Sequence, residues 1–295
     1  MSFNESIIYL AFICVFLTAP SSAQDISDTK KAVIIQEHTL DGMPDCNVDN
    51  LYYRTAYILC FNPERKVPNW TAYKVVADFR NTPKREGRLS RFRNDPDIDG
   101  EAKDADYKGY FNSRGYARGH YTPYGVLGGD RDHDGELPNL EASLSDPDDE
   151  KTVFEGNYMS NIAPQHHNGF NGSPGMWWKL ERWLQDKIIT ADNETAHVIA
   201  GAIFGPGDVE KIGPNKDIHV PPMFYKIIVI NKKANKPQRT LAFLFPHHRK
   251  AHQGIHNYLT SIDVVEAMTG IDFFKDTVVD EDIDTLETWQ EHFQD

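Results

Sequence analysis

The chain has 295 residues and a formal net charge of −13 at pH 7. That balance excludes a surface that is basic throughout, although nine basic against seven acidic residues in segment 84–118 leave room for a modest basic groove. The length supports one large core, and no repeat or low-complexity linker divides it. We therefore expect a single domain over residues 24–295.

The N-terminal segment has the form of a secretory signal peptide. Residues 7–19 are an apolar run too short to span a bilayer, and small residues at Ser21 and Ala23 suit cleavage before Gln24. We expect residues 1–23 to be a signal peptide and the mature protein to be secreted and extracellular. No later stretch is apolar enough for a membrane span, so we expect no membrane association.

Two cysteines remain after this leader. Cys46 and Cys60 form an even pair, which in an oxidising compartment most simply makes one disulfide, with two buried thiols as the alternative. Asn69 and Asn193 each begin an Asn-x-Thr sequon. The sequence thus predicts a disulfide-bonded glycoprotein.

The pattern of apolar residues predicts an α+β fold. Amphipathic spacing predicts a helix over 176–188, and a Ser cap with a Gly stop predicts another over 261–269. Residues 81–115 form a long irregular segment, and loops of that length are usually functional. Because no βαβ unit repeats, we expect a mixed central β-sheet flanked by helices. Its strands are predicted from β-branched and aromatic residues at 52–61, 72–79, 198–204, 224–230 and 241–245.

Three polar motifs bring together a titratable base, a cation and oxygen donors. A His titrates near neutral pH, and an Arg can bind an oxyanion through two hydrogen bonds. Amide and carboxylate oxygens suit a hard divalent cation. Hydrolysis of a phosphodiester requires these three kinds of group. The side chains that supply them are His120, Arg118, Asn161, Asn171 and Glu181.

Each motif alone has an ordinary structural explanation, since a lone loop His is more often structural and a Trp-Trp-Lys-Leu-Glu helix is more often a packed amphipathic element. Their ordered combination resembles the DNA/RNA non-specific endonucleases. This ββα-metal (His-Me finger) group includes mitochondrial endonuclease G and secreted bacterial nucleases. The family pattern is Asp-Arg-Gly-His, then Asn-Tyr-x-Ser-Asn-x-x-Pro-Gln, then Asn-Gln-x-x-Trp-x-x-Leu-Glu. The resemblance extends from residue 33 to residue 293.

The resemblance implies a role for each matching residue. His120 matches the general base, and Arg118 matches the arginine that contacts the phosphate. Asn171 matches the one direct protein ligand of a hydrated Mg²⁺, with Mn²⁺ as the alternative ion. Asn161 and Glu181 match groups that support the metal and the phosphate. The resemblance also implies a ββα-metal core, DNA and RNA as substrates, and a homodimer. The side chains that we expect to contact the substrate are Arg91, Arg93, Arg182 and His167.

Three positions depart from the family pattern. Ala117 stands where the family usually has Asp, so a contact that would orient the site is missing. Additional residues before the helix make Asn168 a competitor of Asn171 as metal ligand. The basic residue expected one turn after the helical Glu falls on Gln185, with Arg182 as a nearby substitute.

Segment 130–141 predicts a second metal site. Its spacing fits the Asp-x-Asp-x-Asp-Gly-x₅-Glu calcium loop, with a solvated acidic turn as the alternative, and the acids of 95–106 repeat the pattern less well. Zinc is disfavoured, because the His166-His167 and His247-His248 pairs have no Cys or acidic ligand at zinc spacing. The expected ligands of a structural Ca²⁺ are Asp130, Asp132, Asp134, Glu136 and Glu141.

The sequence therefore predicts a secreted, sugar-non-specific endonuclease. It would hydrolyse DNA and RNA phosphodiester bonds with a His general base and one hydrated divalent metal. Two alternatives remain open. One is a nuclease-like nucleic-acid-binding domain with weakened catalysis, for which Ala117 is the argument. The other is a phosphodiesterase acting on small nucleotides.

Overall fold

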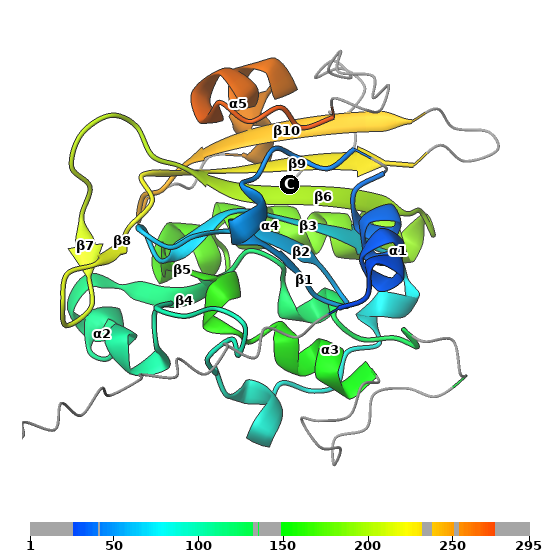
Figure 1. Ribbon diagram of the computed structural model, residues 1–295. Coiled ribbons are helices and arrows are strands. Elements are labelled where there is room, and N and C mark those ends of the chain that lie inside the picture. Colours follow the sequence, from blue (N-terminus) through cyan, green and yellow to red (C-terminus); the bar gives the residue numbers. More distant parts are fainter. Residues whose placement is uncertain are drawn as a thin grey trace, which may run out of the picture.

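A seven-stranded antiparallel sheet organises the part of the chain that the structure describes (Figure 1). The structure is a computed structural model and describes residues 26–40, 42–131, 135, 149–231, 238–250 and 254–274. In the order in which they pair, the strands are β1 (Leu51–Tyr53), β2 (Ile58–Asn62), β3 (Val67–Val75), β6 (Ala196–Ile203), β9 (Met223–Ile230), β10 (Arg239–Pro246) and β11 (Leu259–Thr260).

Two short two-stranded antiparallel sheets lie outside this sheet. One is the strand pair of β4 (Tyr116–His120) and β5 (Ile162–His166), and the other is the hairpin of β7 (Lys211–Ile212) and β8 (Ile218–His219). The α-helices of the described ranges are α1 (Asp28–His38), α2 (Tyr110–Arg114), α3 (Asp149–Glu155), α4 (Met176–Trp183) and α5 (Ile262–Thr269).

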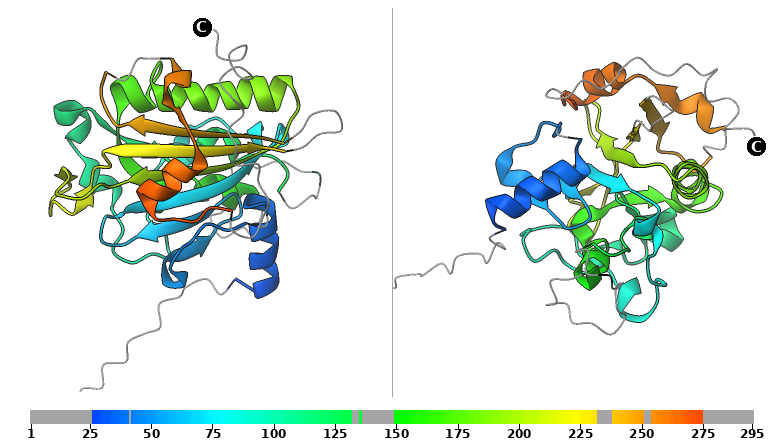
Figure 2. Two further views of the ribbon diagram at one scale, coloured as in Figure 1. Left: turned by 90° about the horizontal axis from the view of Figure 1, so that it is seen from above. Right: turned by 90° about the vertical axis from the view of Figure 1, so that its right-hand side faces the viewer.

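Helices cover both faces of the sheet (Figure 2). On one face, Trp177 and Leu180 of α4 join the main core cluster, which also contains buried residues of β4 and β5. On the other face, Ile34 of α1 and Val265 of α5 pack in a second cluster. Strand side chains point alternately to the two faces, so neighbouring residues of one strand contribute to different cores. The β4–β5 strand pair and α4 therefore pack on the same face of the large sheet.

The predicted elements are largely present, with different ends. The α+β class is confirmed, and all pairs of the large sheet are antiparallel where a mixed sheet was expected. α5 is capped as predicted, because Ser261 Oγ accepts a hydrogen bond from Val264 N–H at 3.2 Å. The helix predicted over 176–188 is α4 followed by a π-helical segment, Leu184–Ala191. The strand predicted over 52–61 is interrupted by a turn.

Cys46 and Cys60 form the predicted disulfide, which joins the segment before β1 to β2. Asn193 is exposed in the turn before β6, as a glycan acceptor requires. Asn69 is partly buried in β3, where its Oδ1 accepts a hydrogen bond from Asn62 Nδ2 at 3.1 Å. Glycosylation at either position stays a prediction.

Several predicted features lie outside the described residues. These are the signal peptide and four of the five expected calcium ligands, Asp132, Asp134, Glu136 and Glu141. The fifth, Asp130, accepts a hydrogen bond from Gly135 N–H at 2.9 Å. No helix within the described ranges combines the length and apolar composition needed to cross a bilayer.

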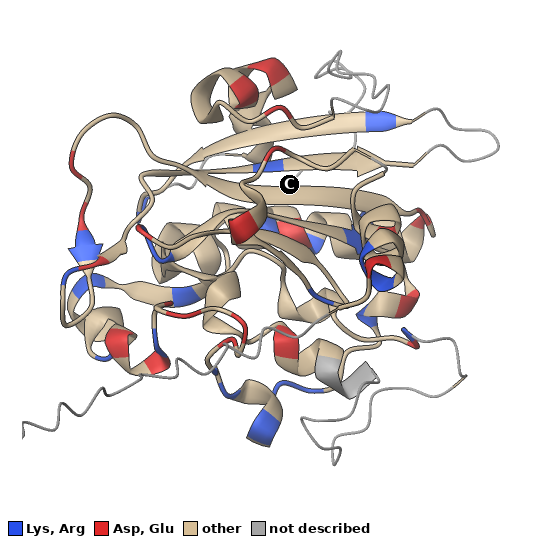
Figure 3. Cartoon of the chain, in the orientation of Figure 1, with Lys and Arg blue, Asp and Glu red and all other residues tan. Residues whose placement is uncertain are grey.

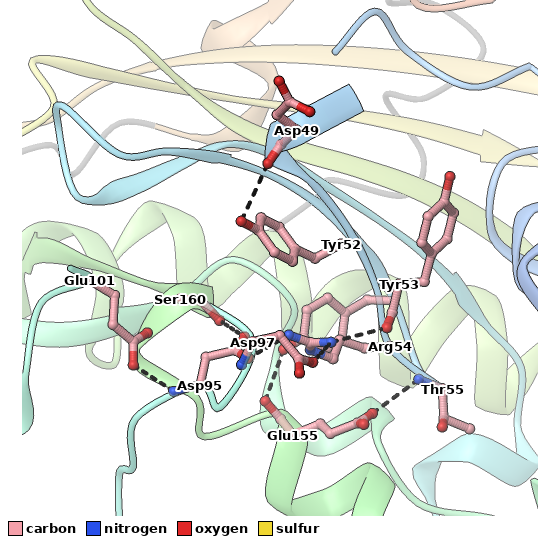
Figure 4. A network of polar contacts seen from close by, with 11 residues as sticks. Asp49, Tyr52, Tyr53, Arg54, Thr55, Asp95, Asp97, Glu101, Glu155 and Ser160 are labelled. Atoms are coloured by element: carbon pink, nitrogen blue, oxygen red, sulfur yellow. Dashed lines mark hydrogen bonds and ion pairs between the residues drawn. The ribbon is translucent and has the colours of Figure 1, made fainter. Parts of the chain in front are cut away.

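A buried guanidinium ties the β1–β2 turn to the two loops that lead into β4 and β5 (Figure 4). Arg54 is 3% exposed, and its guanidinium lies 2.5 Å from Asp95 and 2.8 Å from Asp97. Ser160 Oγ donates to the other oxygen of Asp95 at 2.6 Å, and Glu155 accepts a hydrogen bond from the backbone N–H that follows Arg54. Asp95 and Asp97, which the sequence offered as weak calcium ligands, are thus neutralised by an internal cation.

Replacement of Arg54 should destabilise the fold strongly. Arg54→Met leaves Asp95 buried without its counter-charge, which costs about 3–5 kcal/mol of unfolding free energy. Urea denaturation with the disulfide intact measures this value. Lys31→Met, which removes only an exposed ion pair with Asp28, should leave the unfolding midpoint unchanged. A loss below about 1 kcal/mol for Arg54→Met would contradict the importance of the buried pair.

Candidate active site

His120 is the last residue of β4, at one end of the β4–β5 strand pair. His120 pairs with Ile162, and Gly119 pairs with Ala163. The glycine in Arg-Gly-His has a steric cause, because a Cβ at position 119 would collide with the side chain of Gln165, which is fully buried. The close packing of Gln165 over the β4–β5 strand pair therefore explains why a residue without a side chain precedes His120.

A side-chain amide sets the tautomer of His120. Asn157 Nδ2 donates to the carbonyl oxygen of Leu89 at 2.7 Å, which turns Asn157 Oδ1 toward the imidazole. The distance from His120 Nε2 to Asn157 Oδ1 is 3.1 Å. Because this oxygen only accepts hydrogen bonds, Nε2 must carry the proton. The other ring nitrogen, Nδ1, is then the unprotonated one and can act as a base.

The environment keeps this imidazole neutral. Burial is the main cause, and the positive charge of Arg85 adds to it, so the pKa of His120 is lowered to about 3, while the hydrogen bond with Asn157 opposes the shift. Arg85 donates to Asn157 Oδ1 at 3.1 Å, and its guanidinium lies 4.9 Å from the Phe92 ring centroid. The same amide oxygen therefore places a base and a cation side by side.

Two adjoining cavities open in front of His120. The larger has a volume of about 820 Å³ and is lined by Arg118 and Phe92 among others, and the smaller has about 220 Å³ and is lined by Glu181. Arg85, His120 and Asn171 line both cavities. We call the two cavities together the active cleft. Most of the residues that the sequence singled out, from motifs far apart along the chain, meet here.

Arg118 has an anionic partner within the cleft. Its guanidinium lies 2.7 Å from the Asp104 carboxylate and 4.8 Å from the Phe92 ring centroid. Around β4 and α2, basic and acidic segments of the ribbon are interleaved (Figure 3). Ala117, where the family usually has Asp, lies beside Arg118 on β4, so the carboxylate near this arginine comes from a different segment.

The Glu181 carboxylate forms an ion pair with a lysine of the large sheet. Lys226 on β9 is 1% exposed, and its ammonium lies 2.9 Å from Glu181 Oε1 and 3.7 Å from the Trp177 ring centroid. Burial raises the pKa of Glu181, and the charge of Lys226 offsets part of that rise. The carboxylate lies at the wall of the smaller cavity with a fixed orientation.

Asn171 ends the irregular turn that precedes α4. It is partly buried and lines both cavities, whereas Asn168 is exposed and lines neither. An amide oxygen beside the Glu181 carboxylate is the donor chemistry that Mg²⁺ and Mn²⁺ prefer. No group of three or more His, Cys, Asp or Glu in the described residues is arranged to hold a metal. The residues of the cleft fit a hydrated divalent cation near Asn171.

Other predicted site residues lie elsewhere. Asn161 is fully buried, and its amide exchanges hydrogen bonds with the backbone N–H and carbonyl of Thr122 at 2.9 and 3.0 Å. It therefore aligns the chain after His120 and does not face the cleft. Neither Arg91 nor Arg93 lines the two cavities, and the Arg93 guanidinium lies 4.5 Å from the Phe154 ring centroid.

Two of the predicted substrate contacts do reach the cleft. Arg182 lines the smaller cavity, although its guanidinium also pairs with Asp186 at 2.6 Å. His167 lines the larger cavity and is exposed. Gln185, which stands where the family has a basic residue, is buried at the wall of the smaller cavity.

Sequence reasoning missed four residues of the site. Asn157 was inside a quoted motif without a role, and Arg85 and Asp104 were unmarked within the irregular segment. Lys226 lies in the strand predicted over 224–230, in a stretch that also matches the family, and no role is predicted for it. Asn157 begins the same motif that contains Asn161.

The fold is that of a ββα-metal nuclease. A crystal structure of EndoG in complex with EndoGI superposes with a TM-score of 0.60, with 23% sequence identity, over 79% of this chain and 89% of that one. The chain belongs to the DNA/RNA non-specific endonuclease family, whose sequence model matches residues 36–280. The resemblance noted from the sequence is thereby confirmed.

Named relatives are nucleases. Nuclease C1 of Cunninghamella echinulata var. echinulata is 27% identical over 75% of this chain and 81% of its own length. "Nuclease 1, mitochondrial" of Schizosaccharomyces pombe is 25% identical over 73% of this chain and 63% of its own length. The mitochondrial nuclease of Saccharomyces cerevisiae is 23% identical over 77% of this chain and 66% of its own length. The chain thus spans less than two thirds of these two mitochondrial relatives. It is placed among hydrolases that act on nucleic acids.

Removal of the Arg85 charge should raise the pKa of His120. In Arg85→Gln the protonated imidazole no longer faces a guanidinium, so its pKa rises from about 3 but stays below 6.5, because burial is the larger cause. A pH titration of labelled histidines by NMR in the metal-free protein measures the change. Arg182→Gln is the matched control, since Arg182 pairs with Asp186. An unchanged pKa in Arg85→Gln would show that the cation does not act on this ring.

Proposed function

We propose that the protein is an exported endonuclease that hydrolyses phosphodiester bonds of DNA and RNA with a His general base and one hydrated divalent cation. The observation that carries the proposal is that His120, hydrogen-bonded through Nε2 to Asn157, lines a cleft together with Arg85 and Asn171. A base, a cation and an oxygen donor within one cleft match what phosphodiester hydrolysis needs.

The residues of the chain divide the chemistry between them. His120 Nδ1 accepts the proton of the attacking water, while Nε2–H keeps its hydrogen bond to Asn157 Oδ1. Arg85 and Arg118 line the same cleft and can hold the phosphoryl oxygens, on which negative charge grows as water adds to phosphorus. One ester P–O bond then breaks, and the departing oxygen must be neutralised.

A divalent cation would supply that neutralisation. The family depends on a divalent metal, and we assign the binding role to Asn171, with Glu181 orienting the water around the ion. When bound, the metal stabilises the charge of the leaving oxygen as a Lewis acid. Mg²⁺ is the proposed ion, with Mn²⁺ able to use the same oxygen donors.

Export is proposed from the leader and the disulfide. Residues 7–19 are an apolar run too short to span a bilayer, and the small residues Ser21 and Ala23 follow it, as in a signal peptide. The Cys46–Cys60 disulfide suits an oxidising compartment. These features separate this chain from the two relatives whose names place them in mitochondria.

His120→Ala should abolish most of the hydrolysis. Loss of a positioned base typically lowers the rate by about 10²–10⁴-fold. Relaxation of supercoiled plasmid and cleavage of RNA, each with Mg²⁺ and with an EDTA control, measure the effect. His248→Ala, an exposed histidine outside the cleft, should cleave like the wild type.

Three outcomes separate the proposal from its alternatives. Binding of polymer without cleavage by the wild type would indicate a nuclease-like binding domain. Hydrolysis of bis(4-nitrophenyl) phosphate without cleavage of polymer would indicate a phosphodiesterase for small substrates. Full activity of His120→Ala would exclude this imidazole as the base.

Asn171 and Asn168 provide a matched test of the metal ligand. Asn171→Ala should raise the Mg²⁺ concentration needed for half-maximal rate by roughly tenfold or more, because a direct oxygen donor is lost. Asn168→Ala should leave that concentration unchanged, because the exposed Asn168 side chain lies outside both cavities. The rate measured against Mg²⁺ concentration gives both values. The reverse order would assign the ligand to Asn168.

A further inference from the structure

Phe111 is an exposed aromatic side chain at the rim of the active cleft. It is 52% exposed, and among the large hydrophobic side chains that are exposed in the described residues it is the one aromatic. It lines the larger cavity together with Arg118, His120 and Asn171. Aromatic side chains are common in the lining of ligand pockets, and covering this ring with a ligand would be favourable.

The helix that carries Phe111 is held in a fixed position. Its neighbour Tyr110 is partly buried, and the Tyr110 hydroxyl donates to the carbonyl oxygen of Gly213 at 3.3 Å and accepts from Lys216 Nζ at 3.2 Å. These contacts fasten α2 to the β7–β8 hairpin. With Tyr110 fixed against the protein, Phe111 remains on the side of α2 that lines the cavity.

The ring of His167 packs against Phe111. The Phe111 and His167 centroids are 5.3 Å apart, with an interplanar angle of 61°. The His167 ring lies against Gly172, where a Cβ would collide with it. Gly172 follows Asn171 directly, so the two-ring pair is connected through one residue to the proposed metal site. We call Phe111 and His167 the ring pair.

The charges of the larger cavity suit a nucleic-acid strand beside the ring pair. Arg85, Lys108 and Arg118 line this cavity, and the one carboxylate among its lining residues, Asp104, is paired with Arg118. Its volume of about 820 Å³ lies within the roughly 300–1,000 Å³ of small-molecule sites. A phosphate held near His120 would leave the attached nucleoside within this space.

We propose that the ring pair is a stacking site for one unpaired nucleobase next to the scissile phosphate, and that the preferred substrate is therefore single-stranded DNA or RNA. The inference rests on the proposed function. Bases stack on aromatic side chains irrespective of sequence, whereas a base inside a duplex has both faces covered by its neighbours. A stacking site thus favours strands whose bases are already free, without selecting among them.

The test measures binding without cleavage. Fluorescence anisotropy in EDTA gives the Kd of labelled oligothymidine, of an abasic strand of equal length, and of a hairpin duplex. Phe111→Ala should weaken binding of oligothymidine by about fivefold or more, and Phe111→Trp should restore it. Binding of the abasic strand and of the duplex should be unchanged in Phe111→Ala. Met268→Ala on α5, also an exposed apolar residue, is the control and should bind as the wild type does.

The outcomes are distinct from those of the proposed function. Equal weakening of all three ligands by Phe111→Ala, or none, would overturn the stacking site. If Phe111→Ala weakened binding of the duplex and of oligothymidine equally and left binding of the abasic strand unchanged, the preference for single strands would be overturned. A wild type that shows the expected binding pattern but cleaves nothing when Mg²⁺ is added would keep the stacking site and refute the nuclease activity. A melting curve for Phe111→Ala that matches the wild type shows that the variant is folded.

Discussion

The side-chain amide of Asn157 is the contact on which the rest of the site depends. Its nitrogen is committed to the carbonyl of Leu89, so its oxygen must face both His120 and Arg85. One amide therefore decides which nitrogen of the imidazole carries the proton and where the nearest guanidinium lies. A carboxylate at the same position has no proton to give to Leu89, and an apolar side chain would fix neither partner. The proposed base and the neighbouring cation are thus both positioned by one amide oxygen.

Asn157 owes its position to the buried cluster around Arg54. Two residues before it, Glu155 accepts a hydrogen bond from the β1–β2 turn, and three residues after it, Ser160 donates to Asp95. Burial raises the pKa of the neighbouring Glu101 to about 8, so this carboxyl is largely protonated at neutral pH and adds little negative charge to the cluster. The network links segments that are about 100 residues apart in sequence. The geometry of the proposed catalytic residues consequently depends on a charge cluster outside the cleft.

The elements with a clear period were predictable from the sequence, and the site was predictable wherever a motif supplied it. The strands around β6, β9 and β10 and the helix α4 follow from local patterns, and His120, Asn171 and Glu181 line one cleft as the motifs suggested. Arg85 was not predictable, because it lies in an irregular segment whose path is set by tertiary contacts. Lys226 was not predictable for a different reason. It lies in a regular strand, and a strand pattern does not show that one of its residues contacts a carboxylate on a helix.

The neutral imidazole and the nearby guanidinium together provide a physical link between substrate binding and basicity. A ring whose pKa is about 3 is unprotonated at neutral pH but is a weak base. Part of that low value comes from Arg85, whose charge opposes protonation. A phosphodiester bound at Arg85 brings a negative charge that cancels this effect, and the pKa of His120 must then rise. On the proposed function, the imidazole would become a stronger base only when a phosphate is in place. Because the cation that lowers the pKa is the one that we propose binds the phosphate, this coupling would need no conformational change.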